Sequence, residues 1–431
     1  MPLAVPATAT DRQDLDVHLD PAIEGCRLQA VELGGVDRTV PKVIHRELVV
    51  RVGHPLDQPA LRESVRRLRN LGIFRRVDAE VRGAPDRCTL ALHVDEKWTL
   101  LPIFSLGRGG GITFLTAGVQ DIHLLGRMLQ LEGYWQLFGG VHSGGLIFAD
   151  PRLLDRRLSL QLSVGVSRRN RARFDVDGTP RPGWSRHRRQ VGLEFADLRR
   201  PERIWRASAW WIDDRFDNAL LPAAERAGAL ALGLPDRRAW LVGGVGATLG
   251  RIDNDDYLER GRTLDLGLLA GLSGPGGGDA ARPKAPWLRG TLAAKAAWLP
   301  VGRLNLVARV VLAQISRPVE EFGLYVGGLD GVRGLPDSRF FGATLAVVNA
   351  EARLPSYHGR LFALQHVAFV DVGRAAPAWD RRLLRDLPVS IGTGARVIVP
   401  KVARFVARLD VAWVFERRDG WLVSFGAQQA F

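Results

Sequence analysis

An arginine on a glycine-rich segment and an aspartate on a strand-like segment form the pair with the clearest chemistry in the sequence. Residues 327–337 read Gly-Gly-Leu-Asp-Gly-Val-Arg-Gly-Leu-Pro-Asp, which places Arg333 on a loop. Asp371 lies in the segment 369–373, inside a run of alternating apolar and polar residues. Because a guanidinium and a carboxylate can form two parallel hydrogen bonds, such a pair fixes an orientation. We predict that the loop folds inward and that Arg333 binds Asp371; a solvated arginine and an ordinary turn-proximal aspartate are the alternatives.

A second acceptor for Arg333 lies on the preceding alternating run. Glu351 shares one face of that run with Asn349 and Arg353, because residues two apart on a strand point the same way. A buried charge without a partner is costly, so a guanidinium that leaves water needs carboxylates around it. Glu351 is therefore a second candidate partner of Arg333.

The composition of the 431-residue chain is typical of a β-protein. Gly is abundant at 48 residues and Trp at 12, Met is rare at 2, and 46% of the residues are apolar. The apolar residues fall in short alternating bursts, and no apolar run approaches the ~18–20 residues of a membrane-spanning helix. The length allows one large and one small domain.

The front of the chain reads as a small α+β domain. Residues 1–22 are polar and contain Pro and Ala, which indicates a disordered lead. Asp57 is a candidate N-cap, because apolar residues at helical spacing follow it. The predicted order in residues 23–96 is strand, helix, helix, strand, strand, with helices at 43–49 and 60–71 and the later strands at 74–81 and 89–94.

Residues 97–431 read as antiparallel strands joined by turns. Apolar residues alternate with polar or small ones in runs such as 129–137, 158–166, 304–312 and 405–415. These runs add up to about sixteen strands, an even number, as single-chain bacterial barrels have. Side chains cannot fill so wide a cylinder, so its polar face lines water and its apolar face meets lipid. We predict a transmembrane β-barrel; a large soluble β-protein is the alternative.

Two of these segments resemble motifs of the BamA/TamA superfamily of outer-membrane assembly and translocation pores. Val332-Arg333-Gly334 is similar to the family's loop motif, although Leu335 stands where an aromatic residue is usual. The segment from Phe369 to Gly373 is similar to the strand motif whose Asp receives that Arg. The resemblance covers nearly the whole chain.

Three further segments carry the resemblance. Residues 95–98, Asp-Glu-Lys-Trp, resemble the junction that leads into the family's barrel. Residues 121–126 resemble another family pattern, with His123 where Asn is usual. The chain ends in Phe431, as the family's C-terminal insertion signal does.

The resemblance implies a mainly-β fold and a function. One small β-α-α-β-β POTRA-like domain (polypeptide-transport-associated), residues 23–96, would precede a sixteen-stranded antiparallel, surface-antigen-type transmembrane barrel, residues 97–431. The protein would lie in the bacterial outer membrane with its POTRA domain in the periplasm, and would insert or translocate unfolded outer-membrane protein clients. Its lipid-facing wall would contact the bilayer. Accessory subunits are further candidate partners. A two-partner secretion pore for one dedicated substrate and a passive pore are the alternatives.

The two ends of the expected barrel predict a weak seam. The first barrel strand, near residues 99–106, contains Pro102, which cannot donate to a β-ladder. The last strand, residues 421–431, contains Gly426 and ends in Phe431. A weak seam could open sideways and template an incoming strand. A permanently closed, imperfectly regular barrel fits the same residues.

One strand of the POTRA-like domain is a candidate docking edge for extended clients. A free strand edge can recruit a peptide by backbone hydrogen bonds. Charged side chains on an edge strand also prevent unwanted pairing, and the segment 75–82 carries several arginines. A docking edge and a protected edge are therefore both consistent with this segment. The candidate residues are Arg75, Val77, Ala79 and Val81.

Two cysteines fall at the starts of the first and third strands of the POTRA-like domain. If those strands are parallel neighbours, Cys26 and Cys88 can meet, and an oxidising periplasm would favour a disulfide. Two buried free thiols are the alternative.

Several classes of function find no support in the sequence. The net charge of +14 is typical of a solvated basic surface or of contact with anionic lipid head groups. Nucleic-acid binding is not expected, because no basic element carries aromatic platforms. The nine His and two Cys show no metal-ligand spacing. No Gly-x-Ser-x-Gly elbow or phosphate-binding loop occurs, and the first ten residues show no secretory signal. We therefore expect neither enzymatic activity nor a cofactor.

Overall fold

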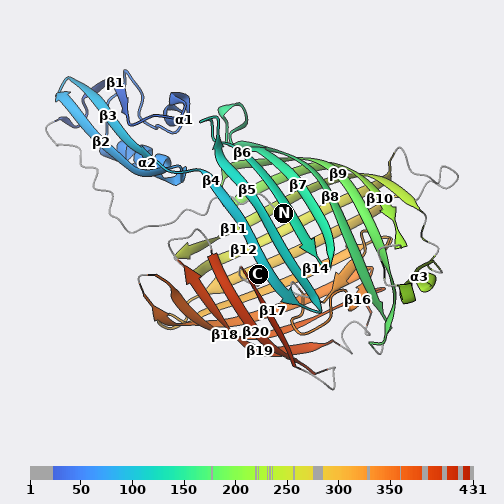
Figure 1. Cartoon of the computed structure of the whole chain (residues 1–431). Coiled ribbons are helices and arrows are strands. Elements are labelled where there is room, and N and C mark those ends of the chain that lie inside the picture. The colour runs from blue at the N-terminus through green and yellow to red at the C-terminus, as the bar shows by residue number, and fades with distance from the viewer. Residues whose placement is uncertain are drawn as a thin grey trace. The chain divides into compact units, whose positions relative to one another are not determined.

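The computed structural model describes most of the chain in two compact units (Figure 1). The described residues are 23–175, 178–218, 221, 223–230, 232, 234, 236–255, 258–274, 285–327, 331–359, 361–380, 387–399, 405–415 and 421–427. The predicted disordered lead, residues 1–22, and the terminal Phe431 lie outside them. The first unit comprises residues 1–102, 119–132 and 148–156, and the second unit holds the remainder of the chain.

The first unit contains a three-stranded sheet and two helices. The central strand β3 pairs in parallel with β1 and antiparallel with β2. The predicted order of strand, helix, helix, strand, strand is confirmed. The elements are β1 (Arg27–Gly34), α1 (Pro41–His45), α2 (Gln58–Asn70), β2 (Phe74–Ala84) and β3 (Arg87–Glu96).

The two helices begin and end for local reasons. The Asp57 side chain accepts a hydrogen bond from the Ala60 N–H at 2.6 Å, which confirms the predicted N-cap of α2. The predicted helix over residues 43–49 is wrong at its end, because α1 stops at His45. The Val49 N–H donates instead to the Ser64 hydroxyl at 2.9 Å, which pulls the backbone toward α2.

Sixteen strands form one closed antiparallel barrel, most of which belongs to the second unit. The predicted first strand at 99–106 lies at β4, which runs slightly further. The strands are β4 (Leu100–Gly109), β5 (Ile112–Leu124), β6 (Leu129–Phe138), β7 (Val141–Asp150), β8 (Leu158–Phe174), β9 (Pro180–Arg200), β10 (Arg203–Phe216), β11 (Arg237–Asp255), β12 (Leu258–Ser273), β13 (Trp287–Trp298), β14 (Asn305–Ile315), β17 (Thr344–His358), β18 (Ala363–Ala376), β19 (Val389–Val399), β20 (Phe405–Val414) and β21 (Trp421–Ala427).

The barrel wall has an apolar outer face and a polar inner face. Val164, Val191, Trp211 and Leu241 are successive cross-strand partners on β8 to β11. The valines and the leucine of this row are 45–56% exposed. Residues of the opposite parity point inward, where charged side chains such as Asp214 and Asp371 are fully buried. No helix in the described part of the chain is long and apolar enough to cross a membrane.

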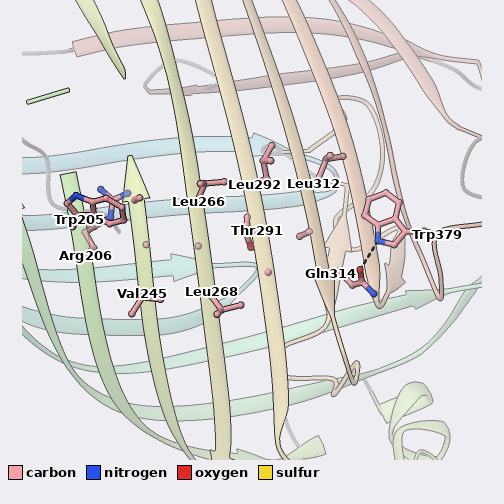
Figure 2. A pocket seen from close by; sticks show the side chains of 15 residues that line it. Trp205, Arg206, Val245, Leu266, Leu268, Thr291, Leu292, Leu312, Gln314 and Trp379 are labelled. Atoms are coloured by element: carbon pink, nitrogen blue, oxygen red, sulfur yellow. Dashed lines mark hydrogen bonds between the residues drawn. The ribbon is translucent and has the colours of Figure 1, made fainter. Parts of the chain in front are cut away.

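The outer face also carries an apolar depression of about 610 Å³ over β10 to β14. Figure 2 shows Leu266, Leu268 and Leu292 along it, with Trp205 at one side and Trp379 at the other. The Trp379 indole N–H donates to the Gln314 side chain at 3.1 Å. A side chain at Gly290 would meet no atom within 4 Å, so the wall is thin here.

A long connection between β14 and β17, residues 316–343, folds against the inner face of the barrel. Its two short strands, β15 (Leu324–Val326) and β16 (Phe340–Gly342), pair as a hairpin. The segment that carries Arg333 lies between these two strands. We call residues 316–343 the lumen loop.

Candidate functional site

The tip of the lumen loop is seated in an apolar pocket before any charge is considered. Val332 and Leu335 are completely buried. They pack with side chains from the loop hairpin and from the barrel wall, namely Val326, Phe340, Val347, Ala375 and Val414. Leu335, which replaces the aromatic residue usual in the family motif, therefore keeps an apolar contact at that place.

The structure brings Arg333 together with both candidate acceptors. The Arg333 Nε and Nη2 groups donate to the two Asp371 oxygens at 2.6 and 2.8 Å, and the Arg333 backbone N–H donates to the same carboxylate at 3.1 Å. The Nη1 group donates to Glu351 Oε1 at 2.6 Å. Arg333 is 3% exposed, and both carboxylates are at most 3% exposed. The loop tip is thus fixed in position and orientation by a desolvated fork.

The neighbours of this pair explain the other motif residues. The Arg333 guanidinium lies 3.5 Å from the centre of the Phe369 ring, a cation–π contact. Gly334 has φ +89°, and a Cβ there would lie 2.6 Å from Val414 Cγ2. A Cβ at Gly373 would lie 2.8 Å from the Ala346 carbonyl oxygen. Both glycines are therefore places where the backbone approaches another strand closely.

The charges around Arg333 form a balanced cluster that sequence reasoning identified only in part. Arg353 Nε donates to Glu351 at 2.7 Å, and Arg396 Nη1 donates to Asp410 at 2.6 Å. The Asn349 amide donates to Asp371 and to the Gly331 carbonyl, each at 2.9 Å. The core of the cluster thus has three guanidiniums and three carboxylates, from Arg333, Arg353, Arg396, Glu351, Asp371 and Asp410.

A second anchor of the lumen loop was not predicted. Glu321 accepts from Arg238 Nη1 at 2.7 Å and from the Trp240 indole N–H at 3.0 Å. Phe322 packs beside Trp287, with ring centres 4.6 Å apart. At a third point the Asp337 backbone N–H donates to the Gly110 carbonyl at 2.8 Å, next to the end of β4. The loop is therefore tied to several separate parts of the barrel wall.

The described residues include one part of the seam between the first and last strands. In the described residues β21 pairs with β4 only through Phe425↔Arg108 and Gly426↔Gly107. By contrast, β17 and β18 pair along almost their whole length. Pro102 lies in the part of β4 outside these pairs, and Phe431 lies outside the described residues. A Cβ at Gly107 would lie 2.5 Å from the Phe114 ring, which keeps this strand position free of a side chain.

The strand β2, which carries the candidate docking residues, lies at an edge of the small sheet. Val77 is buried, Ala79 and Val81 are half-buried, and Arg75 lies 3.6 Å from Asp95. Arg69 of α2 donates to the Val77 carbonyl at 3.1 Å. One backbone carbonyl of β2 therefore already accepts a hydrogen bond. The side of β2 that faces away from β3 is an edge of the sheet.

Cys26 and Cys88 form a disulfide in the first unit. They come together because β1 and β3 are parallel neighbours, with Leu28 opposite Cys88. Both cysteines are buried. The bond closes a chain segment with a sequence separation of 62 residues.

The junction residues and the 121–126 segment meet within the first unit. Glu96 accepts from the Thr39 and Arg38 backbone N–H groups at 2.8 and 3.1 Å. Burial raises the pKa of the Glu96 carboxyl, but these hydrogen bonds outweigh it and hold the pKa below its usual value. His123 Nδ1 accepts from the Met128 N–H at 3.1 Å, so its Nε2 carries the proton and donates to the Thr39 hydroxyl at 3.0 Å.

These features define a class of protein: a sixteen-stranded antiparallel barrel with an inward-folded loop held by a buried arginine–carboxylate fork. No protein-family model and no curated protein matches the sequence. Solved structures do match the fold. BamA from Haemophilus ducreyi lacking POTRA domains 1–3 has a TM-score of 0.67 and 12% identity, covering 94% of this chain and 85% of that one.

Two structures of CdiB are also similar. CdiB from Acinetobacter baumannii has a TM-score of 0.61 and 14% identity, and CdiB from Escherichia coli has 0.63 and 11%. Each alignment covers 94% of this chain, and 74% and 76% of the respective CdiB chain. The chain has a barrel of the BamA and CdiB fold, and the predicted mainly-β fold with a sixteen-stranded antiparallel barrel is confirmed.

Proposed function

We propose that this chain is a bacterial outer-membrane protein that inserts or translocates other proteins, with residues 97–431 as its transmembrane barrel. The observation that carries the proposal is the barrel itself, a closed sixteen-stranded antiparallel cylinder with an inward-folded loop held by the buried Arg333 fork. The likeness of the fold to BamA and CdiB supports it. Residues 23–96 would be a single POTRA domain in the periplasm.

The outer face of the barrel supports a membrane location. Val245 and Leu146 are 60% exposed, and Leu272 and Val423 are 55% and 57% exposed. A continuous exposed apolar surface of this kind is unfavourable in water and favourable against lipid. Closure of the barrel also pairs strand edges that would be costly in hydrocarbon.

The seam would work by strand addition. Once β21 separates from β4, the backbone groups of residues 100–106 of β4 would pair with an incoming strand. A client would first dock as an extended strand at the edge of β2. Backbone pairing and burial of the client's apolar face in lipid would drive the process, and we propose neither an enzymatic step nor a cofactor.

The Arg333 fork would hold the rest of the wall in place while the seam opens. It joins the lumen loop to β17 and β18, which lie four and three strands from β21 in the strand order. The Asp337–Gly110 hydrogen bond reaches the wall beside β4. The loop would therefore brace the barrel against collapse or general unravelling.

Liposome reconstitution tests the proposed function. The purified protein should accelerate folding of an urea-denatured outer-membrane barrel into liposomes, scored by heat-modifiability on gels. Empty liposomes and liposomes with an unrelated closed barrel are the controls. Ion conductance is measured on the same preparation, and conductance without insertion would contradict the assembly function and favour a secretion or passive pore.

A further inference from the structure

A row of basic side chains crosses four neighbouring strands on the outer face of the barrel. Arg168 of β8 is the cross-strand partner of His187 on β9. His187 is in turn opposite Arg215 on β10, and Arg215 is opposite Arg237 on β11. These residues have the same parity as the exposed apolar residues of the outer face, so they face outward. The strands β8, β9 and β10 are neighbours in Figure 1.

Most of this positive charge has no carboxylate partner. A fifth basic residue, Arg189, lies in the adjacent row, opposite Val166 on one side and Asp213 on the other. Asp213 accepts from Arg237 Nε at 2.5 Å. Within the described ranges, Arg168, Arg189 and Arg215 form no ion pair. Like charges directly opposite each other destabilise a sheet, so an anion bound at this row would stabilise it.

The outward row beyond the one that contains Arg189 is apolar. Val164, Val191, Trp211, Leu241 and Leu272 are successive partners from β8 to β12. Val164 and Leu272 at the ends of this row are 56% and 55% exposed. The basic row is therefore separated from the apolar row by the single row that contains Arg189, toward the barrel end where the lumen loop contacts Asp175 through Arg339.

We propose that these residues bind the phosphate-bearing head group of a membrane lipid, whose acyl chains lie along the apolar rows. Adjacent strands are ~4.8 Å apart, so the four residues span ~14 Å, enough for a head group with two phosphates. Arginine presents a fork that matches phosphate oxygens. The proposal rests on the membrane location argued above, because only a membrane supplies head group and acyl chains in this arrangement.

Lipid binding to the full-length protein in neutral detergent micelles tests the site. Cardiolipin, which carries two phosphates, is titrated and its binding is measured by native mass spectrometry. The variant Arg168→Gln/Arg189→Gln/Arg215→Gln should bind cardiolipin at least tenfold more weakly. Phosphatidylcholine and inorganic phosphate are run in parallel. Inorganic phosphate should not compete at millimolar concentration, and phosphatidylcholine should not distinguish the variant from the parent.

The matched control removes the same charge from the other end of the outer face. Arg203, Arg260 and Arg262 are exposed on β10 and β12, far from the basic row, and they form no ion pair in the part of the chain described. Arg203→Gln/Arg260→Gln/Arg262→Gln should bind cardiolipin as the parent does. Equal loss in both triple variants, or no loss in either, would overturn the proposed site.

Two further measurements keep the test decisive. If the triple variant lacks the heat-modifiable folded form, the single variants Arg189→Gln and Arg215→Gln are titrated instead, with a threefold or greater loss expected for each. Flotation of the parent protein with phosphatidylcholine liposomes tests the membrane location separately. A protein that floats but shows no cardiolipin preference refutes the lipid site and leaves the proposed function standing.

Discussion

Arg333 uses its donor groups as a buried fork, and this decides which substitutions it tolerates. Its Nε and Nη2 groups face Asp371, its Nη1 group faces Glu351, and its plane lies over the Phe369 ring. A lysine has one ammonium and no plane, so it cannot bind both carboxylates and stack on the ring at once.

We expect Arg333→Ala to destabilise the barrel strongly. The change leaves Asp371 and Glu351 buried with one cation fewer, and breaking a buried pair in this way costs about 3–5 kcal/mol. The temperature at which the folded form disappears on gels should fall by roughly 10 °C. Arg333→Lys should recover part of that loss.

The control for this prediction is Arg260→Ala, which removes an exposed arginine of the same barrel. Its transition should stay within a degree or two of the parent, since exposed charges contribute little. If the Arg333→Ala barrel loses its folded form at the same temperature as the Arg260→Ala control, the Arg333 fork does not brace the wall.

At the residue scale, the sequence predicted the partners of Arg333 that lie in recognisable motifs. It missed the charged residues that reach the cluster only because the barrel closes. The alternation placed Glu351 and Asp371 on inward faces, and the glycine-rich segment marked the loop. Asp410 and Arg396 belong to β20 and β19, and only the strand order of the closed barrel brings them to the cluster. Alternation identifies the face of a residue but not the neighbour across the wall.

The lumen loop is the element that depends most on close backbone approach. Gly334 has φ +89°. A Cβ placed on it would lie 2.6 Å from Val414 Cγ2 and 3.2 Å from Ala412 Cβ. Its neighbours Val332 and Leu335 are completely buried, so the loop cannot shift outward without exposing them. A side chain here must therefore displace either the loop tip or β20.

We expect Gly334→Ala to loosen the loop and to lower the heat-modifiability transition. The change combines the positive-φ cost of about 1 kcal/mol with overpacking of about 1–3 kcal/mol. Limited proteolysis should cut the lumen loop faster than in the parent. Gly140→Ala is the matched control, because Gly140 has φ +81° and no atom within 4 Å of its Cβ position.

Gly140→Ala should show the smaller, purely conformational loss and no change in loop cleavage. Equal effects of the two substitutions would mean that the close packing of Gly334 against Val414 does not stabilise the loop.

The second anchor of the loop, at Glu321, could not have been predicted from the sequence. Residues 316–323 follow no periodic pattern, and the partners of Glu321, Arg238 and Trp240, come from a distant strand.

At the scale of the whole barrel, the seam between β21 and β4 is where the last strand meets the first and closes the cylinder. Two residue pairs join β21 to β4 in the part of the chain described, and residues 428–431, which follow β21, lie outside that part. Pro102 and Gly426 predict a weak seam, and this stays a prediction, because residue types do not determine how far β21 extends along β4. Function, in the proposed mechanism, depends on the difference between this seam and the rest of the wall.

Locking the seam should abolish client insertion without unfolding the protein. Arg108 and Phe425 are direct partners across it, so Arg108→Cys/Phe425→Cys should form a disulfide under oxidation. We expect the oxidised variant to lose at least nine-tenths of its insertion rate in liposomes and to regain it after reduction. The control pair Leu292→Cys/Leu312→Cys crosses the fully paired β13–β14 boundary and should stay active when oxidised. An oxidised seam variant that inserts clients at the parent rate would exclude lateral opening, because a covalently closed cylinder offers no strand edge to the client.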